Sequence, residues 1–202
     1  MIGLDPRLDA LPSAIGQGTA TERILAFYRA AMPVLAQHAP AVKPNIAFFE
    51  CFGSEGYAAY ETTCAIARQH GLLVVGDIKR GDIGSTAEAY AEGHFRTADA
   101  VTLHPYLGAD SVEPFLKHCR PERGGKAVFV LVRTSNPGAR DFQDLKVGEH
   151  ALCDVVADAV TRWGRTLPLV EGYSPVGAVV GATWPQELSR LRARLPQDRK
   201  ST

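Results

Sequence analysis

Residues 72–82 read Leu-Leu-Val-Val-Gly-Asp-Ile-Lys-Arg-Gly-Asp, and this stretch decides the fold class. Its first part is a nearly continuous apolar run, which is typical of a parallel strand covered on both faces. Charged residues begin abruptly at Asp77, and a helical pattern starts near Ser85. The stretch therefore predicts a buried strand that ends near Asp77, followed by a tight turn that carries Lys79 and Asp82.

The same alternation of short apolar runs and longer helical patterns extends along the whole chain. Five further strands are predicted, and they end near Asp5, Lys43, Leu103, Val132 and Gly181. Strands that alternate with helices predict a parallel sheet with right-handed crossovers, either doubly wound or closed into a barrel. The glycine-rich nucleotide-binding signatures Gly-x-Gly-x-x-Gly and Gly-x-x-x-x-Gly-Lys-Ser/Thr are missing, and their absence disfavours the doubly wound sheet.

Length and composition predict a single globular domain over residues 1–202. Hydrophobic residues make up 46% and charged residues 22% of the chain, and 22 Lys and Arg balance 22 Asp and Glu. This balance argues against a general binder of nucleic acid or membrane surfaces. We find no signal peptide and no apolar run of about 20 residues, so we expect a cytoplasmic protein. The four cysteines form no Cys-x-x-Cys pair, and we expect all of them to be reduced residues of the core: Cys51, Cys64, Cys119 and Cys153.

Four charged residues near strand ends are the best candidates for chemistry. Asp77 and Lys79 are two residues apart, so an extended strand would point both to one face. Asp82 follows in the turn, and Lys43 ends another predicted strand. Each carboxylate favours the ammonium form of a neighbouring lysine, and a positioned ammonium can protonate a developing carbanion. The competing interpretation is a pair of ion pairs on the surface.

Residues 77–86, Asp-Ile-Lys-Arg-Gly-Asp-Ile-Gly-Ser-Thr, resemble the signature of the orotidine 5'-phosphate decarboxylase family, in its longer bacterial subgroup (type 2). Further segments agree in order: Gly-Leu-Asp-Pro-Arg at 3–7, Val-Lys-Pro-Asn-Ile-Ala-Phe-Phe-Glu at 42–50, His-Pro-Tyr-Leu-Gly at 104–108, Val-Arg-Thr-Ser-Asn-Pro-Gly at 132–138 and Gly-Ala-Val-Val-Gly-Ala-Thr at 177–183. The resemblance implies a (β/α)8 TIM barrel that converts orotidine 5'-monophosphate to uridine 5'-monophosphate and carbon dioxide. It implies neither a metal nor an organic cofactor.

The resemblance also implies catalytic roles. Asp77 would lie beside the substrate carboxylate, where its repulsion is relieved as carbon dioxide leaves. Lys79 would stabilise the vinyl carbanion and protonate it. Lys43 would hold Asp77 and the ribose in place. Asp82 would reach into the neighbouring subunit's site, which predicts a homodimer.

The remaining implied roles concern substrate binding. Asp5 would accept a hydrogen bond from a ribose hydroxyl, and Ser135 would hydrogen-bond the pyrimidine. Thr86 would line the partner's pocket. We interpret His104 as structural and Arg7 as structural or dimer-related. Arg133 and Arg140 could contact a phosphate, be solvated, or support neighbouring site residues. We interpret Trp163 and Trp184 as core aromatics.

The chain departs from the family pattern in its length. A (β/α)8 barrel takes about 250 residues, and its loops after strands seven and eight commonly hold phosphate. We count six strands, and we expect residues 198–202 to be a frayed tail. The sequence therefore predicts an incomplete barrel, truncated at both ends, with little or no activity alone.

Three alternatives stay open at this point. The first is a Mg²⁺-dependent sugar-phosphate decarboxylase or hexulose-phosphate synthase relative, which should carry a carboxylate where Lys43 stands. The second is a Schiff-base aldolase, whose lysine should be desolvated rather than flanked by carboxylates. The third is a non-catalytic barrel remnant that only pairs with an intact subunit.

Overall fold

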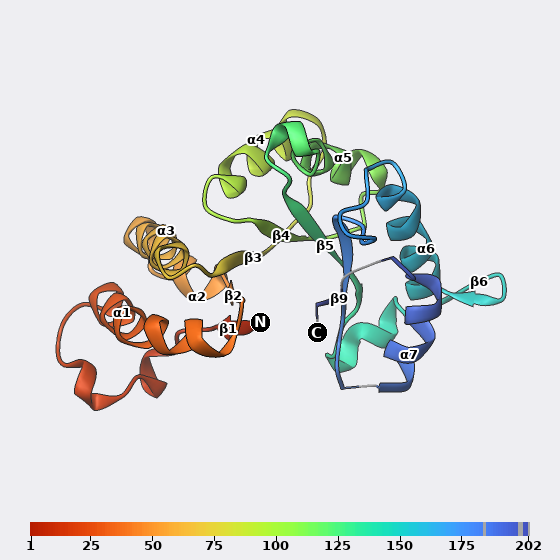
Figure 1. Ribbon diagram of the computed structural model, residues 1–202. Coiled ribbons are helices and arrows are strands. Elements are labelled where there is room, and N and C mark those ends of the chain that lie inside the picture. Colours follow the sequence, from red (N-terminus) through yellow and green to blue (C-terminus); the bar gives the residue numbers. More distant parts are fainter. Residues whose placement is uncertain (184, 198–199, 202) are drawn as a thin grey trace. The chain divides into compact units, whose positions relative to one another are not determined.

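The computed structural model describes residues 1–183 and 185–197 and the backbone of residues 200–201. Trp184 and residues 198, 199 and 202 lie outside this part, so the predictions of a core aromatic and a frayed tail are not tested there. The strands are hydrogen-bonded in the order β1-β2-β3-β4-β5-β8-β9. Figure 1 shows the elements coloured along the chain. The chain divides into two compact units: one comprises Met1–Ile78 and Gly93–Val101, the other Lys79–Glu92 and Thr102–Thr202.

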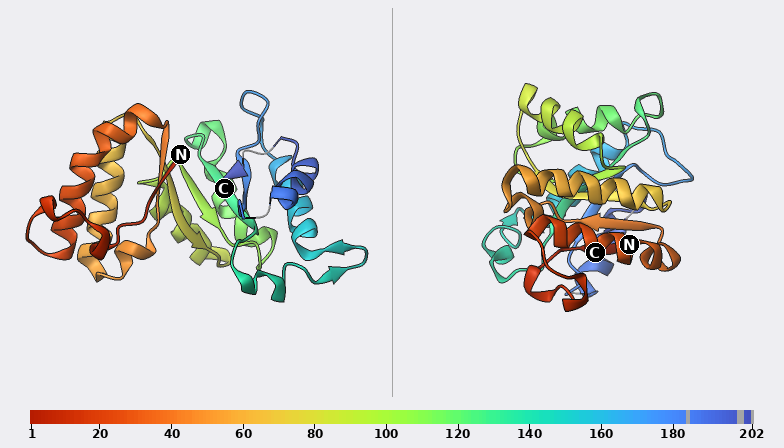
Figure 2. Two further views of the ribbon diagram at one scale, coloured as in Figure 1. Left: turned by 90° about the horizontal axis from the view of Figure 1, so that it is seen from below. Right: turned by 90° about the vertical axis from the view of Figure 1, so that its left-hand side faces the viewer.

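The first unit is a parallel arrangement of strands with helices on one face. It contains β1 (Ile2–Leu4), α1 (Ala20–His38), β2 (Ala41–Pro44), α2 (Ala47–Glu50), α3 (Gly53–Gln69), most of β3 (Leu73–Arg80) and the start of β4 (Ala100–Leu103), with short 3-10 turns at Leu8–Ala10 and Ser13–Ile15. A reciprocal capping box between Thr19 and Glu22 starts α1. Both views in Figure 2 and the view in Figure 1 show α1 and α3 side by side.

The end of α3 determines where β3 begins. Gly71 has a φ of 74°, which is the left-handed conformation that glycine adopts without strain. The N–H groups of Gly71 and Leu72 donate to the carbonyls of Arg68 and Ala67, respectively, in the two-bond pattern of a Schellman motif. The chain then reverses directly into β3, whose residues 74–78 are all buried.

The second unit continues the alternation of strands and helices. It contains most of α4 (Gly84–Phe95), the end of β4, α5 (Ala109–His118), β5 (Ala127–Arg133), β6 (Lys146–Val147), β7 (His150–Ala151), α6 (Leu152–Gly164), β8 (Val176–Val180), α7 (Pro185–Arg194) and β9 (Lys200–Ser201), with 3-10 turns at Pro121–Arg123 and Pro137–Asp141. The small antiparallel hairpin of β6 and β7 was not predicted from the sequence. Ion pairs of Asp154 with Arg190 and of Asp158 with Arg194 join α6 to α7.

The structure confirms the six predicted strands and corrects two details. First, β3 runs on to Arg80, whereas the sequence predicted its end near Asp77. Second, Lys200 and Ser201 pair in parallel with Ala178 and Val179 of β8, so a seventh strand begins where we expected a frayed tail. The backbone N–H and C=O groups along the edge of β8 account for this difference, because they can pair with any segment whose backbone lies in register with them.

Candidate active site

The first unit gathers the predicted polar residues on one face of its strands. The parallel register pairs Gly3 with Lys43, and an isolated bridge pairs Asn45 with Asp77. Because side chains alternate along a strand, these residues and Asp5 share one face. Side chains on the other face are apolar and buried: Leu4, Val42, Val74 and Ile78.

An ion pair between Lys43 and Asp77 is the centre of this group. Lys43 Nζ donates a hydrogen bond to Asp77 Oδ2 at 2.9 Å. The Asp77 side chain is only 8% exposed and that of Lys43 is 22% exposed, so the pair is largely shielded from water. Water therefore screens this pair less than a surface pair, and the carboxylate depends on the ammonium for compensation.

Asn45 is a site residue that the sequence reasoning missed. Its Nδ2 donates to Asp5 Oδ1 at 3.1 Å, and its backbone N–H donates to the carbonyl of Leu4. Gly3 leaves room for the same carboxylate, because a Cβ there would lie 2.9 Å from Asp5 Oδ2. The amide of Asn45 therefore orients Asp5. The predicted convergence of strand ends could have identified Asn45, which lies two residues after Lys43.

An aromatic cluster supports this face from the buried side. The rings of Tyr28 and Phe49 stack with centroids 6.5 Å apart, and Tyr60 meets Phe49 edge-on at 5.6 Å. Gly76 is required for the approach of Tyr60, because a Cβ there would lie 2.8 Å from the Tyr60 hydroxyl. Burial, with a smaller contribution from the charge of Asp5, raises the pKa of Tyr28 above its ordinary value. Tyr28 therefore stays a neutral phenol.

The second unit carries Lys79, and its backbone corrects one step of the sequence argument. Lys79 has a φ of 47°, a left-handed conformation that is uncommon for any residue other than glycine. Strict alternation of faces therefore ends at Lys79, and the argument that extended geometry points it the same way as Asp77 is not valid. Its N–H donates to Thr102 Oγ1 at 3.0 Å, and Thr102 is buried. Strain of this kind is concentrated at functional positions.

Asp82 and Thr86 lie in an exposed segment around the start of α4. Asp82 Oδ1 accepts a hydrogen bond from the N–H of Ile83 at 2.8 Å. The side chains of Ile83, Thr86 and Tyr90 are exposed and lie at spacings that share a helical face. The structure therefore presents Asp82 beside a partly apolar, accessible surface.

Ser135 is exposed at the carboxyl end of β5, next to a hollow of about 450 Å³. Arg140 and Thr183 line the same hollow. Arg133 also lines it, and of the roles that the sequence left open for Arg133, the solvated one is wrong. Its side chain is 5% exposed and contacts Asp144 at 2.7 Å and Glu187 at 2.8 Å.

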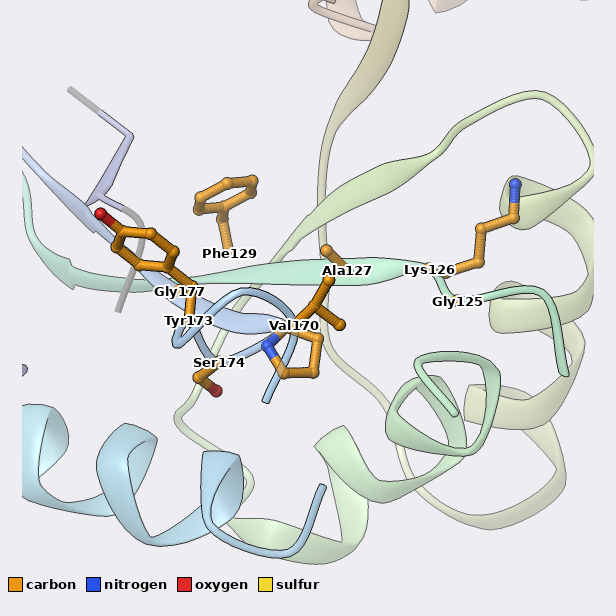
Figure 3. A pocket seen from close by; sticks show the side chains of 9 residues that line it. Gly125, Lys126, Ala127, Phe129, Val170, Tyr173, Ser174 and Gly177 are labelled. Carbon is orange, nitrogen blue, oxygen red and sulfur yellow. The ribbon is translucent and has the colours of Figure 1, made fainter. Parts of the chain in front are cut away.

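Two other cavities belong to the second unit. One of about 900 Å³ lies behind the residues that follow Ser135, and its lining includes Leu131, Phe142 and Gln143. Another of about 160 Å³ lies at the amino ends of β5 and β8, and Figure 3 shows Lys126 pointing away from its other lining side chains. The latter lies at the opposite strand ends from Ser135, and parallel α/β enzymes bind ligands at the carboxyl ends.

Two further findings concern the whole described chain. Among residues 1–183 and 185–197, no group of three or more His, Cys, Asp or Glu side chains is arranged to hold a metal ion. No helix in the same part of the chain combines the length and apolar character that crossing a bilayer requires.

All four cysteines are free, and Cys51 is exposed, which corrects our expectation that all four lie in the core.

Comparisons with known proteins agree with this fold. The model of the "Orotidine 5'-phosphate decarboxylase / HUMPS family" matches residues 19–197. The chain is 41% identical to orotidine 5'-phosphate decarboxylase of Rhodopirellula baltica, over 96% of this chain and 69% of the relative. It is 44% identical to that of Thermomicrobium roseum, over 96% of this chain and 66% of the relative.

A solved structure gives the same result. The structure of Leishmania donovani OMP decarboxylase superimposes with a TM-score of 0.82 at 40% identity, covering 98% of this chain and 72% of the other. The predicted fold class, α/β of the (β/α)8 barrel type with about six strand–helix repeats, is confirmed.

Proposed function

Because the chain belongs to the orotidine 5'-phosphate decarboxylase / HUMPS family, we propose that it converts orotidine 5'-monophosphate to uridine 5'-monophosphate and carbon dioxide in pyrimidine biosynthesis. The ion pair of Lys43 with the buried carboxylate of Asp77, two residues before Lys79, is the observation that carries this proposal. Asp77 repels the substrate carboxylate, and departure of carbon dioxide relieves that repulsion.

The proposed step balances as follows. The bond between the pyrimidine ring and its carboxylate breaks, carbon dioxide leaves, and the electron pair stays on the ring carbon. The ammonium of Lys79 stabilises this carbanion and then gives it a proton, and solvent reprotonates the lysine. Lys43 holds Asp77 in place, and Asp5, oriented by Asn45, accepts a hydrogen bond from a ribose hydroxyl. Ser135 hydrogen-bonds the pyrimidine.

Lys43 also bears on the magnesium-dependent alternative. A divalent ion at the end of β2 would meet the ammonium of Lys43, which is 2.9 Å from Asp77 Oδ2 and has its charge compensated there. The positive charges of a divalent ion and of the Lys43 ammonium would repel each other strongly in a shielded site. The two relatives compared above are orotidine 5'-phosphate decarboxylases, which does not favour this alternative or the non-catalytic remnant.

The test is formation of uridine monophosphate from orotidine monophosphate by the purified 202-residue chain. The proposal expects turnover that persists with a chelator and is lost in Lys79→Ala. Turnover that disappears on chelation would favour the magnesium-dependent alternative. The wild-type chain making no product would contradict the proposal for this chain.

We further propose a homodimer in which Asp82 and Thr86 serve the neighbouring site. The exposed side chains of Ile83 and Tyr90 around them support this proposal, since apolar surface beside a polar site is common at interfaces. Mixing inactive Lys79→Ala and Asp82→Ala chains should restore about a quarter of wild-type activity, because half of the dimers hold one intact site. No recovery on mixing would contradict the shared site. A cytoplasmic location and a single domain over residues 1–202 stay predictions.

A further inference from the structure

We infer that Gln143 is a positioning residue for Ser135, and that it sets recognition of the pyrimidine without contacting it. The inference rests on the proposed function, because it assigns a cause to the placement of the residue that would contact the base. Gln143 lies eight residues after Ser135, near the middle of the segment that joins β5 to α6. Its side chain is half-buried, whereas Ser135 is exposed.

The side chain of Gln143 holds the residue just before Ser135 by two hydrogen bonds. The backbone N–H of Thr134 donates to Gln143 Oε1 at 2.9 Å, and Gln143 Nε2 donates to Thr134 Oγ1 at 2.8 Å. A backbone N–H can only donate, so it determines which end of the amide faces it. The hydroxyl of Thr134 then donates onward to Asn136 Oδ1 at 2.7 Å. The residues on both sides of Ser135 are thus tied to a single amide.

Gln143 is itself firmly held by its backbone. Its N–H donates to the carbonyl of Ala139 at 2.8 Å, and its carbonyl accepts the N–H of Cys153 at 3.1 Å, at the start of α6. Substituting the side chain leaves both bonds intact. The amide is therefore a rigid support and not a mobile surface group.

The segment around Ser135 forms a wall between two cavities. Ser135 lines the hollow of about 450 Å³, whereas Gln143 lines the cavity of about 900 Å³ behind it. Thr134 and Asn136 line both. Gln143 therefore supports this segment from the cavity that Ser135 does not line.

Gly181 restricts Ser135 from a second direction. Its N–H donates to the carbonyl of Arg133 at 2.8 Å, and a Cβ at this position would lie 3.1 Å from both the N and the Cβ of Ser135. The close approach of Gly181 and the two hydrogen bonds of Gln143 together limit how far the segment around Ser135 can shift. A hydroxyl on a segment held in this way can discriminate a base by hydrogen bonding, because misplacement by about 1 Å is enough to lose such an effect.

The experiment measures binding of two probes by calorimetry: uridine 5'-monophosphate, which has the base, and ribose 5-phosphate, which lacks it. Gln143→Met should weaken binding of uridine monophosphate about tenfold, equivalent to about 1.4 kcal/mol. Binding of ribose 5-phosphate should change less than about twofold, because the base contact alone is lost. The same variant should raise KM for orotidine monophosphate more than it lowers kcat.

Three further variants separate positioning from general damage. Gln143→Glu keeps the size of the side chain but cannot donate to the Thr134 hydroxyl, so it should also weaken binding of uridine monophosphate. Thr134→Ser keeps every hydrogen bond and should behave as wild type. Gln37→Met, a matched change at an exposed amide that bonds only the carbonyl of Pro33, should have no effect.

A double variant tests the route through Ser135. In a Ser135→Ala background, Gln143→Met should add less than about twofold, because coupled residues are not additive. Each of three results would overturn the inference and leave the proposed function intact. The first is a double variant in which the effects of the two single substitutions multiply. The others are Gln143→Met weakening the binding of both probes equally, or leaving the binding of uridine monophosphate unchanged. A wild-type chain that neither makes uridine monophosphate nor binds either probe would overturn the proposed function, and the inference with it.

Discussion

Replacing Lys43 with methionine should destabilise the protein by about 2–3 kcal/mol, because the change removes the cation that is paired with the buried carboxylate of Asp77. Asp77 is 6% exposed, and its carboxylate has Lys43 Nζ at 2.9 Å. Removing one partner of a fully buried pair costs about 3–5 kcal/mol, and we lower this range because some water can reach the 22%-exposed side chain of Lys43. For a domain of this size the loss corresponds to a fall in Tm of about 4–12 °C.

Replacing the other partner of this ion pair, Asp77, should lower the free energy of unfolding by less. Asp77→Asn leaves an ammonium that can extend toward water, so we expect a loss of about 1 kcal/mol. The double variant should lose less than the sum of the two single variants.

Lys117→Met is the matched control. Lys117 Nζ also lies 2.9 Å from a carboxylate, that of Glu88, but the two side chains are 51% and 57% exposed. An exposed pair of the same length contributes little, so this variant should unfold like the wild type. Urea unfolding followed by circular dichroism measures all four variants. Equal losses for Lys43→Met and Lys117→Met would refute the argument that burial, and not pairing distance, determines the energy.

Three further predictions follow from single positions. Lys79→Ala should lower kcat about 10²–10⁴-fold. Lys79→Gly should be no less stable than Lys79→Ala, since glycine relieves the φ of 47°. A lower free energy of unfolding in urea for the glycine variant would contradict strain at this position. Gly71→Ala should cost about 1 kcal/mol and Gly71→Asn less, measured by thermal unfolding, because its φ of 74° is strained for alanine while no atom crowds the added Cβ. A thiol reagent should modify Cys51 rapidly in the native protein and Cys64 and Cys119 only after unfolding. Burial raises the pKa of Cys64 and Cys119 from 9.0 to about 12, so these thiols ionise at lower pH in the unfolded chain than in the folded one. The free energy of unfolding should therefore fall as the pH rises from about 9 to about 12. A free energy of unfolding in urea that stays constant over this range would contradict the prediction.

Much of the fold could be predicted because burial patterns are local. The apolar runs in β3 and β5 are typical of parallel strands covered on both faces, and neighbouring residues alone encode that pattern. The positions of the strand ends followed from where charged residues and glycines interrupt the runs. The prediction near Asp77 was too short by three residues, because backbone hydrogen bonding continues beyond the apolar run to Arg80.

Arg133 shows where such reasoning stops. A guanidinium after a strand is normally solvated, and nothing near it in the sequence reveals the two carboxylates that hold it. Asp144 and Glu187 lie 11 and 54 residues away along the chain, and only the folded structure brings both within 3 Å. A local pattern carries no information about such distant partners.

The amino-acid sequence by itself determined the alternation of strands and helices, the charged residues Lys43, Asp77, Lys79 and Asp82 near strand ends, and the resemblance to a decarboxylase family. Only the tertiary structure decided that Lys43 pairs with Asp77, that Asn45 orients Asp5, and that Gln143 holds the segment around Ser135. The physical reason is the difference between periodicity and register. Periodicity depends on neighbours a few residues apart, whereas register and loop packing depend on contacts across tens of residues, and these exist only after the chain has folded.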